Sequence, residues 1–234
     1  MSHDPLPVCI LAGGRATRLG ALAEHRPKAL IEVAGRPFLA HQLAQLAASG
    51  LRRAVLCVGH MGERVEATLG RRCAGVDLEY SYDGPGLDGT LGAIRRAAPR
   101  LGPRFLVLYG DTYLRLDYRA FWEQWGRSGR PAAMTVLLND GRWDRSNALF
   151  SDGLVRLYDK ARPVPAMRWI DYGLGGLTAE VLAAVPDTES DLAGLYHHLS
   201  VTGRLFGFEV AERFYEIGTP AALAETEAFL RGAP

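Results

Sequence analysis

The sequence contains few of the features that mark secreted, zinc-binding or membrane-bound proteins. Cysteine occurs only at Cys9, Cys57 and Cys73, and no C-x-x-C pair is present, which argues against a disulfide framework and a zinc site. No apolar stretch is long enough to cross a bilayer, and residues 1–7 contain neither a basic nor an apolar signal region. We therefore expect a cytoplasmic protein without a membrane partner, whose cysteines pack in the core.

An excess of charge of one sign is also missing. Lys plus Arg number 27 and Asp plus Glu number 26, and the two signs are interspersed along the chain. This distribution argues against a nucleic-acid partner, which requires a basic patch. Hydrophobic residues make up 48% of the 234 residues, enough for a large folded core. Because the sequence shows no repeat or linker, we expect a single domain over residues 1–234.

Apolar runs of strand length alternate with helical patterns in the first half of the chain. The runs at 8–12, 54–58 and 105–108 each end at a polar or glycine-containing loop. Helical spacing of apolar residues occurs at 38–48, 64–69 and 91–98. This order predicts an α/β fold with a Rossmann-like, mostly parallel mixed sheet flanked by helices. Such sheets bind ligands at the carboxyl ends of their strands.

The second half of the chain has a different pattern, with short strand candidates separated by turns. These candidates lie at 134–138, 148–150, 154–158, 169–177 and 204–210. We expect them to extend the sheet and to build a second wall beside it. A final helix is predicted to begin near Pro220, with Thr219 as its cap.

The strongest local signal is the segment 11–19, Leu-Ala-Gly-Gly-Arg-Ala-Thr-Arg-Leu. The pair Gly13 and Gly14 directly after a buried strand lets backbone N–H groups approach an anion closely. Arg18 and Lys28 add positive charges that suit a triphosphate. The spacing matches neither the P-loop nor the G-x-G-x-x-G dinucleotide fingerprint. We interpret the segment as a phosphate site of another kind.

Together with Pro27-Lys28, this segment resembles the signature of the sugar-1-phosphate nucleotidyltransferase family. Further similarities follow in the family's order: Gly-Arg-Pro-Phe-Leu at 35–39, Gly-Thr-Leu-Gly-Ala at 89–93, Gly110-Asp111, Tyr-Asp-Lys at 158–160 and Tyr-Glu-Ile-Gly-Thr-Pro at 215–220. The chain looks most similar to the heptose-1-phosphate guanylyltransferase and N-acetylmuramate-1-phosphate uridylyltransferase branches. The resemblance implies a nucleotide-binding half over about 5–130 and a sugar-phosphate-binding half over about 131–234, in a monomer or homodimer.

The resemblance implies a reaction between an NTP and a sugar 1-phosphate that yields an NDP-sugar and pyrophosphate, with Mg²⁺ as cofactor. Arg18, Lys28 and Asp111 are the implied catalytic residues. Arg18 would grip the β- and γ-phosphates, and Lys28 would bridge the α-phosphate and the sugar phosphate. Asp111 and Glu216 would bind the metal. Glu216 stands where the family usually has Asp, and its extra methylene leaves room for a water between its carboxylate and the ion.

The same resemblance implies residues for the two substrates. The nucleotide would contact Leu11, Ala12, Gly13, Gly14, Tyr82, Gly89 and Thr90. The sugar phosphate would contact Asn147, Lys160, Asp171 and Gly173, with Lys160 on the phosphate. Asp171 replaces an Asn of the family, and an ionised carboxylate only accepts hydrogen bonds, so it would favour sugar hydroxyls over an acyl carbonyl. Tyr82 reads equally well as an ordinary strand residue, and Ala16 replaces a loop glycine of the family.

Two other functions remain open. A catalytically silent homologue would bind a nucleotide sugar and regulate a partner, although the presence of Arg18, Lys28 and Asp111 argues against this function. A cytidylyltransferase acting on a cyclitol or another non-sugar phosphate would use much the same nucleotide site. Guanylyl or uridylyl transfer is favoured only by the subfamily resemblance.

Overall fold

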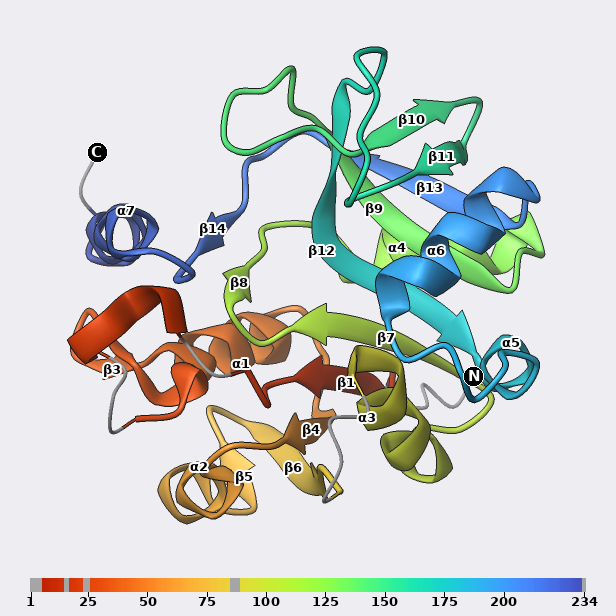
Figure 1. Cartoon of the computed structure of the whole chain (residues 1–234). Coiled ribbons are helices and arrows are strands. Elements are labelled where there is room, and N and C mark those ends of the chain that lie inside the picture. Colours follow the sequence, from red (N-terminus) through yellow and green to blue (C-terminus); the bar gives the residue numbers. More distant parts are fainter. Residues whose placement is uncertain (1–5, 15–16, 23–25, 85–88, 233–234) are drawn as a thin grey trace.

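A ten-stranded sheet runs through the molecule and carries helices on both faces (Figure 1). The structure is a computed structural model that describes residues 6–14, 17–22, 26–84 and 89–232. The strands lie in the order β10-β11-β13-β9-β12-β7-β1-β4-β6-β5. Their bounds are Ala148–Ser151 (β10), Leu154–Tyr158 (β11), Leu205–Val210 (β13), Ala132–Leu138 (β9), Trp169–Thr178 (β12), Arg104–Tyr109 (β7), Val8–Leu11 (β1), Arg53–Val58 (β4), Val76–Tyr82 (β6) and Arg72–Cys73 (β5).

The part of the sheet built by the first half of the chain is parallel, except for the two-residue edge strand β5, which pairs antiparallel with β6. Strand β1 pairs in parallel with β4 and with β7, and β4 pairs in parallel with β6. Parallel neighbours need a crossover connection, and the helices α1 (Phe38–Ala48), α2 (Gly62–Leu69) and α3 (Gly89–Ala97) provide it. Helix α1 has the predicted bounds, whereas α2 and α3 each begin two residues before the predicted start. The carboxyl ends of β1, β4, β6 and β7 therefore meet at one edge.

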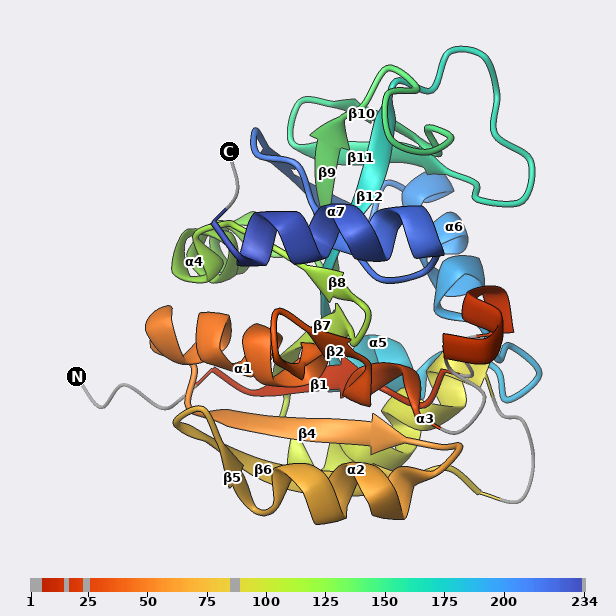
Figure 2. The same cartoon turned by 90° about the vertical axis from the view of Figure 1, so that its left-hand side faces the viewer.

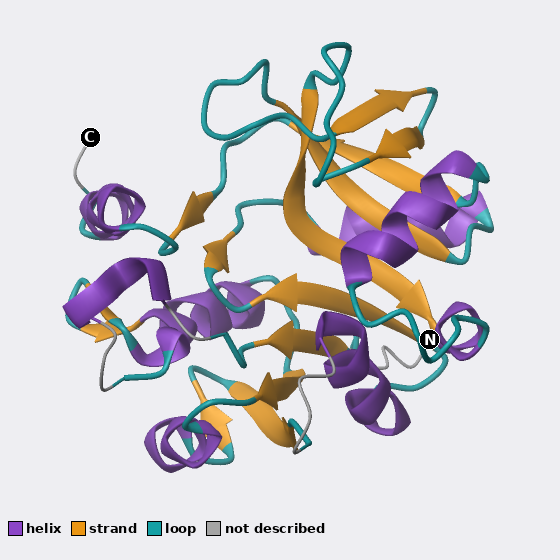
Figure 3. Cartoon of the chain, viewed as in Figure 1, coloured by secondary structure: helices purple, strands orange, loops and turns teal. Residues whose placement is uncertain are grey.

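Beyond β7 the sheet is largely antiparallel (Figure 3). Strand β12 pairs antiparallel with β7 and with β9, and only β13 returns parallel to β9 among the described strands of this half. The hairpin between β10 and β11 turns at Asp152 and Gly153, which both have positive φ, as a two-residue turn requires. The mostly parallel order that the sequence predicts thus holds for the first half, and short turns produce the antiparallel pairs of the second.

Alternate residues of β1 show how the two faces are covered. Val8 and Ile10 pack in one cluster with residues of α1, α2 and α4 (Tyr118–Ser128). Cys9 points to the other face and packs in a cluster with α3, α5 (Ala179–Ala183) and α6 (Leu192–Val201). A parallel strand buried on both faces is apolar throughout, which explains why its run is easily recognised in the sequence. The structure also adds α6, which the sequence pattern does not predict.

Short elements close the structure around the carboxyl edge of the sheet. Strand β8 (Thr112–Tyr113) follows β7 and pairs antiparallel with β14 (Tyr215–Glu216), so that Glu216 lies opposite Thr112. Helix α7 (Pro220–Leu230) follows, and Thr219 caps it as predicted, by accepting a hydrogen bond from the N–H of Ala222. Figure 2 shows α7 lying across the molecule, near the helical segment η1 (Thr17–Leu22). The ring of Tyr215 stacks on Phe229 of α7 at 3.9 Å, which anchors β14.

Four further short segments complete the description: β2 (Glu32–Val33) and β3 (Arg36–Pro37), which pair with each other, and the 3₁₀ segments η2 (Lys28–Leu30) and η3 (Ala98–Arg100). Among the described residues, no helix has the length and apolar character needed to span a membrane.

Candidate active site

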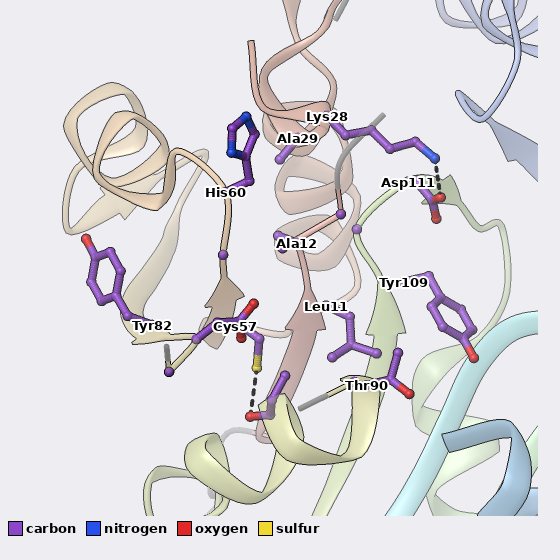
Figure 4. Close-up of a pocket in the computed structure, with 18 of the residues that line it drawn as sticks. Leu11, Ala12, Lys28, Ala29, Cys57, His60, Tyr82, Thr90, Tyr109 and Asp111 are labelled. Atoms are coloured by element: carbon purple, nitrogen blue, oxygen red, sulfur yellow. Dashed lines mark hydrogen bonds and ion pairs between the residues drawn. The ribbon is translucent and has the colours of Figure 1, made fainter. Parts of the chain in front are cut away.

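One cavity opens where the parallel strands end, and it has a volume of about 920 Å³. Figure 4 shows it between the ends of β1, β4, β6 and β7. Most of the residues that the sequence assigns to the nucleotide or to catalysis line it: Leu11, Ala12, Gly13, Gly14, Lys28, Tyr82, Gly89, Thr90 and Asp111. The structure therefore brings together segments that lie up to 100 residues apart in the sequence, as expected for the carboxyl edge of an α/β sheet.

At the floor of this cavity, the segments that follow β1, β4 and β6 lie in close contact. A Cβ atom added to Gly13 would lie 2.9 Å from Oδ2 of Asp83 and 3.1 Å from the N of Gly59. A side chain at Gly13 would therefore displace the Asp83 carboxylate and crowd the backbone that follows β4, which favours glycine there. By contrast, Gly14 has open space around it and is exposed toward the cavity. Ala16, which replaces a family glycine, lies outside the described residues.

Lys28 and Asp111 meet at the mouth of the cavity (Figure 4). The Nζ of Lys28 donates a hydrogen bond to Oδ2 of Asp111 at 2.6 Å, and the Thr112 hydroxyl donates to Oδ1 at 3.1 Å. The Lys28 side chain is 13% exposed and that of Asp111 is 31% exposed, so both are accessible to a ligand in the cavity. This ammonium–carboxylate pair is the centre of the site.

Glu216 and Arg18 lie next to this pair. Burial raises the pKa of the Glu216 carboxyl, and the charge of Asp111 raises it further, while Lys28 and Arg18 act in the opposite direction. The carboxylate of Glu216 and the guanidinium of Arg18 both flank Gly218, where an added Cβ would lie 2.9 Å from one and 3.2 Å from the other. The predicted set of Arg18, Lys28, Asp111 and Glu216 is therefore assembled in one place.

The Asp111 and Glu216 carboxylates fit a hard divalent cation. They lie close enough to repel each other, and a cation between them would relieve that repulsion and favour the ionised form of Glu216. In the described ranges, no group of three or more His, Cys, Asp or Glu residues could hold a metal. Two carboxylates suit Mg²⁺, which proteins usually bind through one or two carboxylates together with substrate phosphates and water.

The side chain of Thr90 bonds to the start of α6, a contact that the sequence does not reveal. Its hydroxyl donates to Oδ1 of Asp191 at 3.0 Å and accepts from the N–H of Leu192 at 2.7 Å. The N–H of Leu91 donates to the carbonyl of Ser190 at 2.9 Å. These contacts join the N-terminus of α3, which lines the cavity, to the N-terminus of α6 in the second half of the chain. We call them the Thr90–Asp191 latch.

On the nucleotide role that the resemblance implies for this cavity, replacing Asp191 by Ala is expected to raise KM for the NTP about threefold to tenfold, the usual effect of losing one hydrogen bond. The value of kcat should stay nearly unchanged, because the latch holds Gly89 and Thr90 at the cavity wall. Loss of the α6 cap should also lower stability by about 1 kcal/mol. Asp191→Asn retains an oxygen that can accept from Thr90 and from the N–H of Ala193, so it should behave like the wild type. Steady-state kinetics on both variants, with exposed Asp187→Ala as control, test this. An unchanged KM in Asp191→Ala would contradict it.

Tyr82 and Tyr109 occupy opposite walls of the cavity. The hydroxyl of Tyr82 donates to the carboxylate of Glu66 on α2, and this hydrogen bond raises the Tyr82 pKa to about 12. Figure 4 shows the Tyr82 hydroxyl turned away from the cavity, so only its ring remains for a base. Burial raises the pKa of Tyr109, and the charge of Asp171 raises it further. Tyr109, which belongs to none of the motifs singled out in the sequence, thus lines the cavity and lies near Asp171.

The residues assigned to the sugar phosphate lie around an irregularity of β12, beyond Tyr109. The pairing of β12 with β9 shifts register between Asp171 and Gly175. The Oδ1 of Asn147 accepts from the N–H of Asp171 at 2.9 Å, and Oδ1 of Asp171 accepts from the N–H of Gly173 at 3.0 Å. Gly173 has φ of 107°, and an added Cβ would lie 3.4 Å from the Thr112 side chain. The structure thus places these residues beside the strand that follows Asp111.

Hydrogen bonds within the protein limit what Asn147 and Asp171 can offer to a ligand. The Asn147 carbonyl and one oxygen of Asp171 are already used within the protein, so Asp171 offers mainly Oδ2, to which the Tyr158 hydroxyl lies at 3.5 Å. Lys160 is exposed, and its charge lowers the pKa of Asp171, so it lies near this carboxylate. Neither Lys160 nor Asp171 lines the cavity. They form a neighbouring region near Tyr109, whose pKa the charge of Asp171 raises.

Replacing Asp171 by Asn is expected to raise the melting temperature at pH 7 and to have less effect near pH 4. Burial raises the Asp171 pKa from its ordinary value of 3.8, so the stability linked to this group is fully present below pH 3.8 and is lost as the pH rises through the folded-state pKa. Each pKa unit is worth about 1.4 kcal/mol, and 1 kcal/mol shifts the melting temperature of a chain this long by about 2–4 °C. Calorimetry at both pH values, with exposed Asp152→Asn as control, measures this. Equal differences at pH 4 and pH 7 would contradict it.

Comparison with known proteins identifies the family. Residues 8–200 match the model of the MobA-like NTP transferase domain. The chain belongs to this family. It is therefore a nucleotidyltransferase, and the resemblance that the sequence motifs indicate, the α/β fold and the class of enzyme are confirmed. In coarse terms its activity is that of a nucleotidyltransferase for sugar phosphates or related phosphates.

Individual relatives of this nucleotidyltransferase differ in substrate. An N-acetylmuramate alpha-1-phosphate uridylyltransferase of Caulobacter vibrioides is 29% identical over 243 residues, which cover 98% of this chain and 99% of that protein. A CMP-5'-(3-aminopropyl)phosphonate synthase of Streptomyces rubellomurinus is 32% identical over 74% of this chain, which spans only 32% of that protein. A putative glucose-1-phosphate thymidylyltransferase from Bacillus anthracis has a TM-score of 0.83 over 96% of this chain and 95% of that one, at 20% identity, and shows the shared fold.

Proposed function

We propose that this nucleotidyltransferase joins a sugar 1-phosphate to an NTP, giving an NDP-sugar and pyrophosphate, with Mg²⁺ held by Asp111 and Glu216. The observation that carries the proposal is the arrangement of Lys28, Asp111, Glu216 and Arg18 at the mouth of a glycine-floored cavity. Two cations and two carboxylates in one place suit a reaction between two anionic substrates. Catalysis then consists mainly of positioning and charge neutralisation.

The nucleotide occupies the cavity. Backbone N–H groups of Gly13 and Gly14, at the end of β1, bind its phosphates, while Leu11, Ala12 and Gly89 shape the walls around the base and ribose. Arg18 holds the β- and γ-phosphates, which leave as pyrophosphate. The ring of Tyr82 contacts the base. These roles follow the family pattern at positions that line the cavity, except that Arg18 lies at its edge beside Glu216.

Lys28 lies where the two substrates meet. An oxygen of the sugar phosphate attacks the α-phosphorus, and the bond from this phosphorus to the oxygen bridging the β-phosphate breaks. Lys28 moves little, because its ammonium is already held by Asp111, and it stabilises the negative charge that builds on the α-phosphoryl oxygens. Asp111 and Glu216 would hold Mg²⁺, and the ion would supply positive charge that neutralises the phosphates. No general base is needed, since the attacking phosphate oxygen is ionised at neutral pH.

The acceptor lies in the region of Asn147, Lys160, Asp171 and Gly173, past Tyr109. Lys160 is exposed and free to move onto the acceptor phosphate, and Asp171 accepts from a hydroxyl of the sugar through Oδ2. On this proposal, residues of about 5–130 bind the nucleotide and residues of about 131–234 bind the acceptor. The metal pair joins the two halves, because Asp111 comes from the first and Glu216 from the second.

The choice of base rests on relatives. Uridylyl transfer has the support of the Caulobacter vibrioides uridylyltransferase, which this chain matches over nearly its whole length. Guanylyl transfer rests on the similarity of the motifs to the heptose-1-phosphate guanylyltransferase branch. The name of the Streptomyces rubellomurinus relative, a CMP-phosphonate synthase, supports the alternative of a cytidylyltransferase for a non-sugar acceptor. We place UTP first, GTP second and CTP third.

Pyrophosphate release tests the proposal. The protein is incubated with Mg²⁺, each of ATP, GTP, CTP, UTP and dTTP, and a panel of sugar 1-phosphates, inositol 1-phosphate, phosphocholine and an aminoalkyl phosphonate. We expect release with one NTP and one sugar 1-phosphate, dependent on Mg²⁺ and on Asp111. A clear preference for a non-sugar acceptor would replace the sugar assignment with the cytidylyl-type alternative. Binding of a nucleotide sugar with no turnover of any pair would indicate a silent regulatory homologue.

A further inference from the structure

Gln42 is a buried amide in the middle of α1 that reaches the turn carrying Asp111. Its side chain is at the wall between α1 and the end of β7, and the residue is only 2% exposed. The Nε2 donates to the carbonyl of Tyr109 at 2.8 Å and to the carbonyl of Thr112 at 2.8 Å. These two residues immediately precede and follow Gly110-Asp111. One side chain therefore holds both ends of the turn.

The chemistry of the contact requires an amide in this orientation. Two carbonyl oxygens only accept hydrogen bonds, so the group that faces them must supply two donors, which Nε2 does. The Oε1 atom of Gln42 is buried, and no described residue donates to it. A buried polar atom without a partner is unfavourable and therefore uncommon. Glutamine at this position is thus explained by the turn that it holds and not by packing alone.

Other contacts at the turn act from different directions. The N–H of Gly110 donates to the carbonyl of Leu11 at 2.9 Å, which ties the turn to β1. The carbonyl of Asp111 accepts from the N–H of Ile217 at 3.1 Å, which ties it to the segment after β14. Gln42 supplies the contact from the α1 side. Without it, the turn would be free to shift, and the Asp111 carboxylate would move relative to Lys28, which it now meets at 2.6 Å.

We propose that Gln42 is a positioning residue that fixes the Asp111 carboxylate for metal binding and phosphate transfer. The inference rests on the proposed role of Asp111 as a metal ligand. Gln42 itself touches neither substrate nor ion, because it is enclosed between α1 and the turn. Groups that orient a metal ligand commonly change metal affinity or activity by about 10–100-fold when they are lost. Gln42 belongs to this class of residue.

The test compares two glutamines of the same helix. Gln42→Met removes both donors and keeps the length of the side chain. Gln45→Met is the matched control, because Gln45 lies one turn later on α1 and bonds through Oε1 to the Tyr113 hydroxyl at 3.1 Å, away from the turn carbonyls. Mn²⁺ affinity is measured by electron paramagnetic resonance with a non-hydrolysable NTP analogue. We expect it to fall about tenfold or more in Gln42→Met, and to stay within about twofold of wild type in Gln45→Met.

Kinetics provide a second measurement. In Gln42→Met we expect kcat to fall and the Mg²⁺ concentration for half-maximal rate to rise, each about tenfold, while KM for the NTP and for the acceptor changes little. Excess Mg²⁺ should restore part of kcat, which a general loss of folding would not allow. Gln42→Glu keeps the volume but presents acceptor oxygens to two carbonyls, so it should show the same loss.

Each outcome bears on the inference separately from the proposed function. Mn²⁺ affinity and kcat within about twofold of wild type in both folded Gln42 variants would overturn the inference. If stability falls, the rise in melting temperature caused by Mn²⁺ gives the comparison, and it should be smaller in Gln42→Met than in Gln45→Met. If Asp111→Asn binds Mn²⁺ as tightly as the wild type does, the proposed metal role of Asp111 fails. If Asp111→Asn abolishes binding and the Gln42 variants do not weaken it, only the inference about Gln42 fails.

Discussion

Replacing Asp111 by Asn is expected to lower kcat/KM by about 10³-fold, since each 1.4 kcal/mol of lost transition-state stabilisation is a factor of ten and a bound metal is worth several kcal/mol. Asn keeps the size of the side chain and one acceptor oxygen, but it removes the negative charge that faces Lys28 at 2.6 Å. It also leaves Glu216 as the only carboxylate of the proposed metal pair. Pyrophosphate release under saturating Mg²⁺ measures the loss.

The control for this substitution is Asp77→Asn. Asp77 lies in β6, and its side chain is 67% exposed and pairs with Arg72 at the surface. An exposed pair of this kind contributes little to stability, so activity and melting temperature should both stay near wild type. Activity of Asp111→Asn within about tenfold of wild type would remove Asp111 from the catalytic site.

Replacing Lys28 by Met is expected to lower kcat by about 10²–10³-fold, the usual effect of removing one donor that stabilises charge in the transition state. The change in KM should be smaller, because the glycine backbone and Arg18 still bind the triphosphate. Lys28→Arg should recover only part of the rate, since a planar guanidinium does not place its charge where the compact ammonium does. Stopped-time assays of product formation with both variants measure these differences.

Arg26→Met is the control for Lys28. Arg26 precedes it by two residues and pairs with Glu32 at the surface, where the two side chains are 56% and 60% exposed. Its loss should leave kcat unchanged. If Lys28→Met raises KM strongly and leaves kcat intact, Lys28 binds the substrates equally in the ground and transition states and does not promote the reaction.

The sequence predicts the nucleotide half of the fold well, for a physical reason. Strands such as β1 are buried on both faces and are therefore apolar throughout, and α1 shows a regular apolar face, so local patterns suffice. Helix α6 escapes prediction because it is apolar on several sides and contains Gly194 and two histidines, which weaken its periodicity. The antiparallel order of the second half depends on which strand meets which across the sheet, and local patterns do not specify that.

The candidate site divides in the same way. Gly13 and Asp111 are recognisable in the sequence because they belong to local motifs that follow strands, and Lys28 because it belongs to the motif Pro27-Lys28. The structure places all three around one cavity. The contacts that hold the site in place join residues far apart in the sequence. Gln42 reaches a carbonyl 67 residues away, and Thr90 accepts from an N–H 102 residues away. A pattern within a short window contains no information about such pairs. Gln42 looks ordinary in its own segment, and the motif at 89–93 points to Thr90 without revealing its contact with Asp191.

Glu216 lies near the end of the chain, so it is synthesised after the strands that surround the cavity. Strands β1, β4, β6 and β7, which form the nucleotide cavity, are complete once residue 109 has been synthesised. Glu216 arrives more than 100 residues later on β14, and that strand is held by the stacking of Tyr215 on Phe229 of α7. As a chain emerges from the ribosome, pairings between nearby segments form before distant ones. On the proposed role of Glu216, the metal pair is therefore completed only after β14 has paired with β8 and α7 has packed against Tyr215.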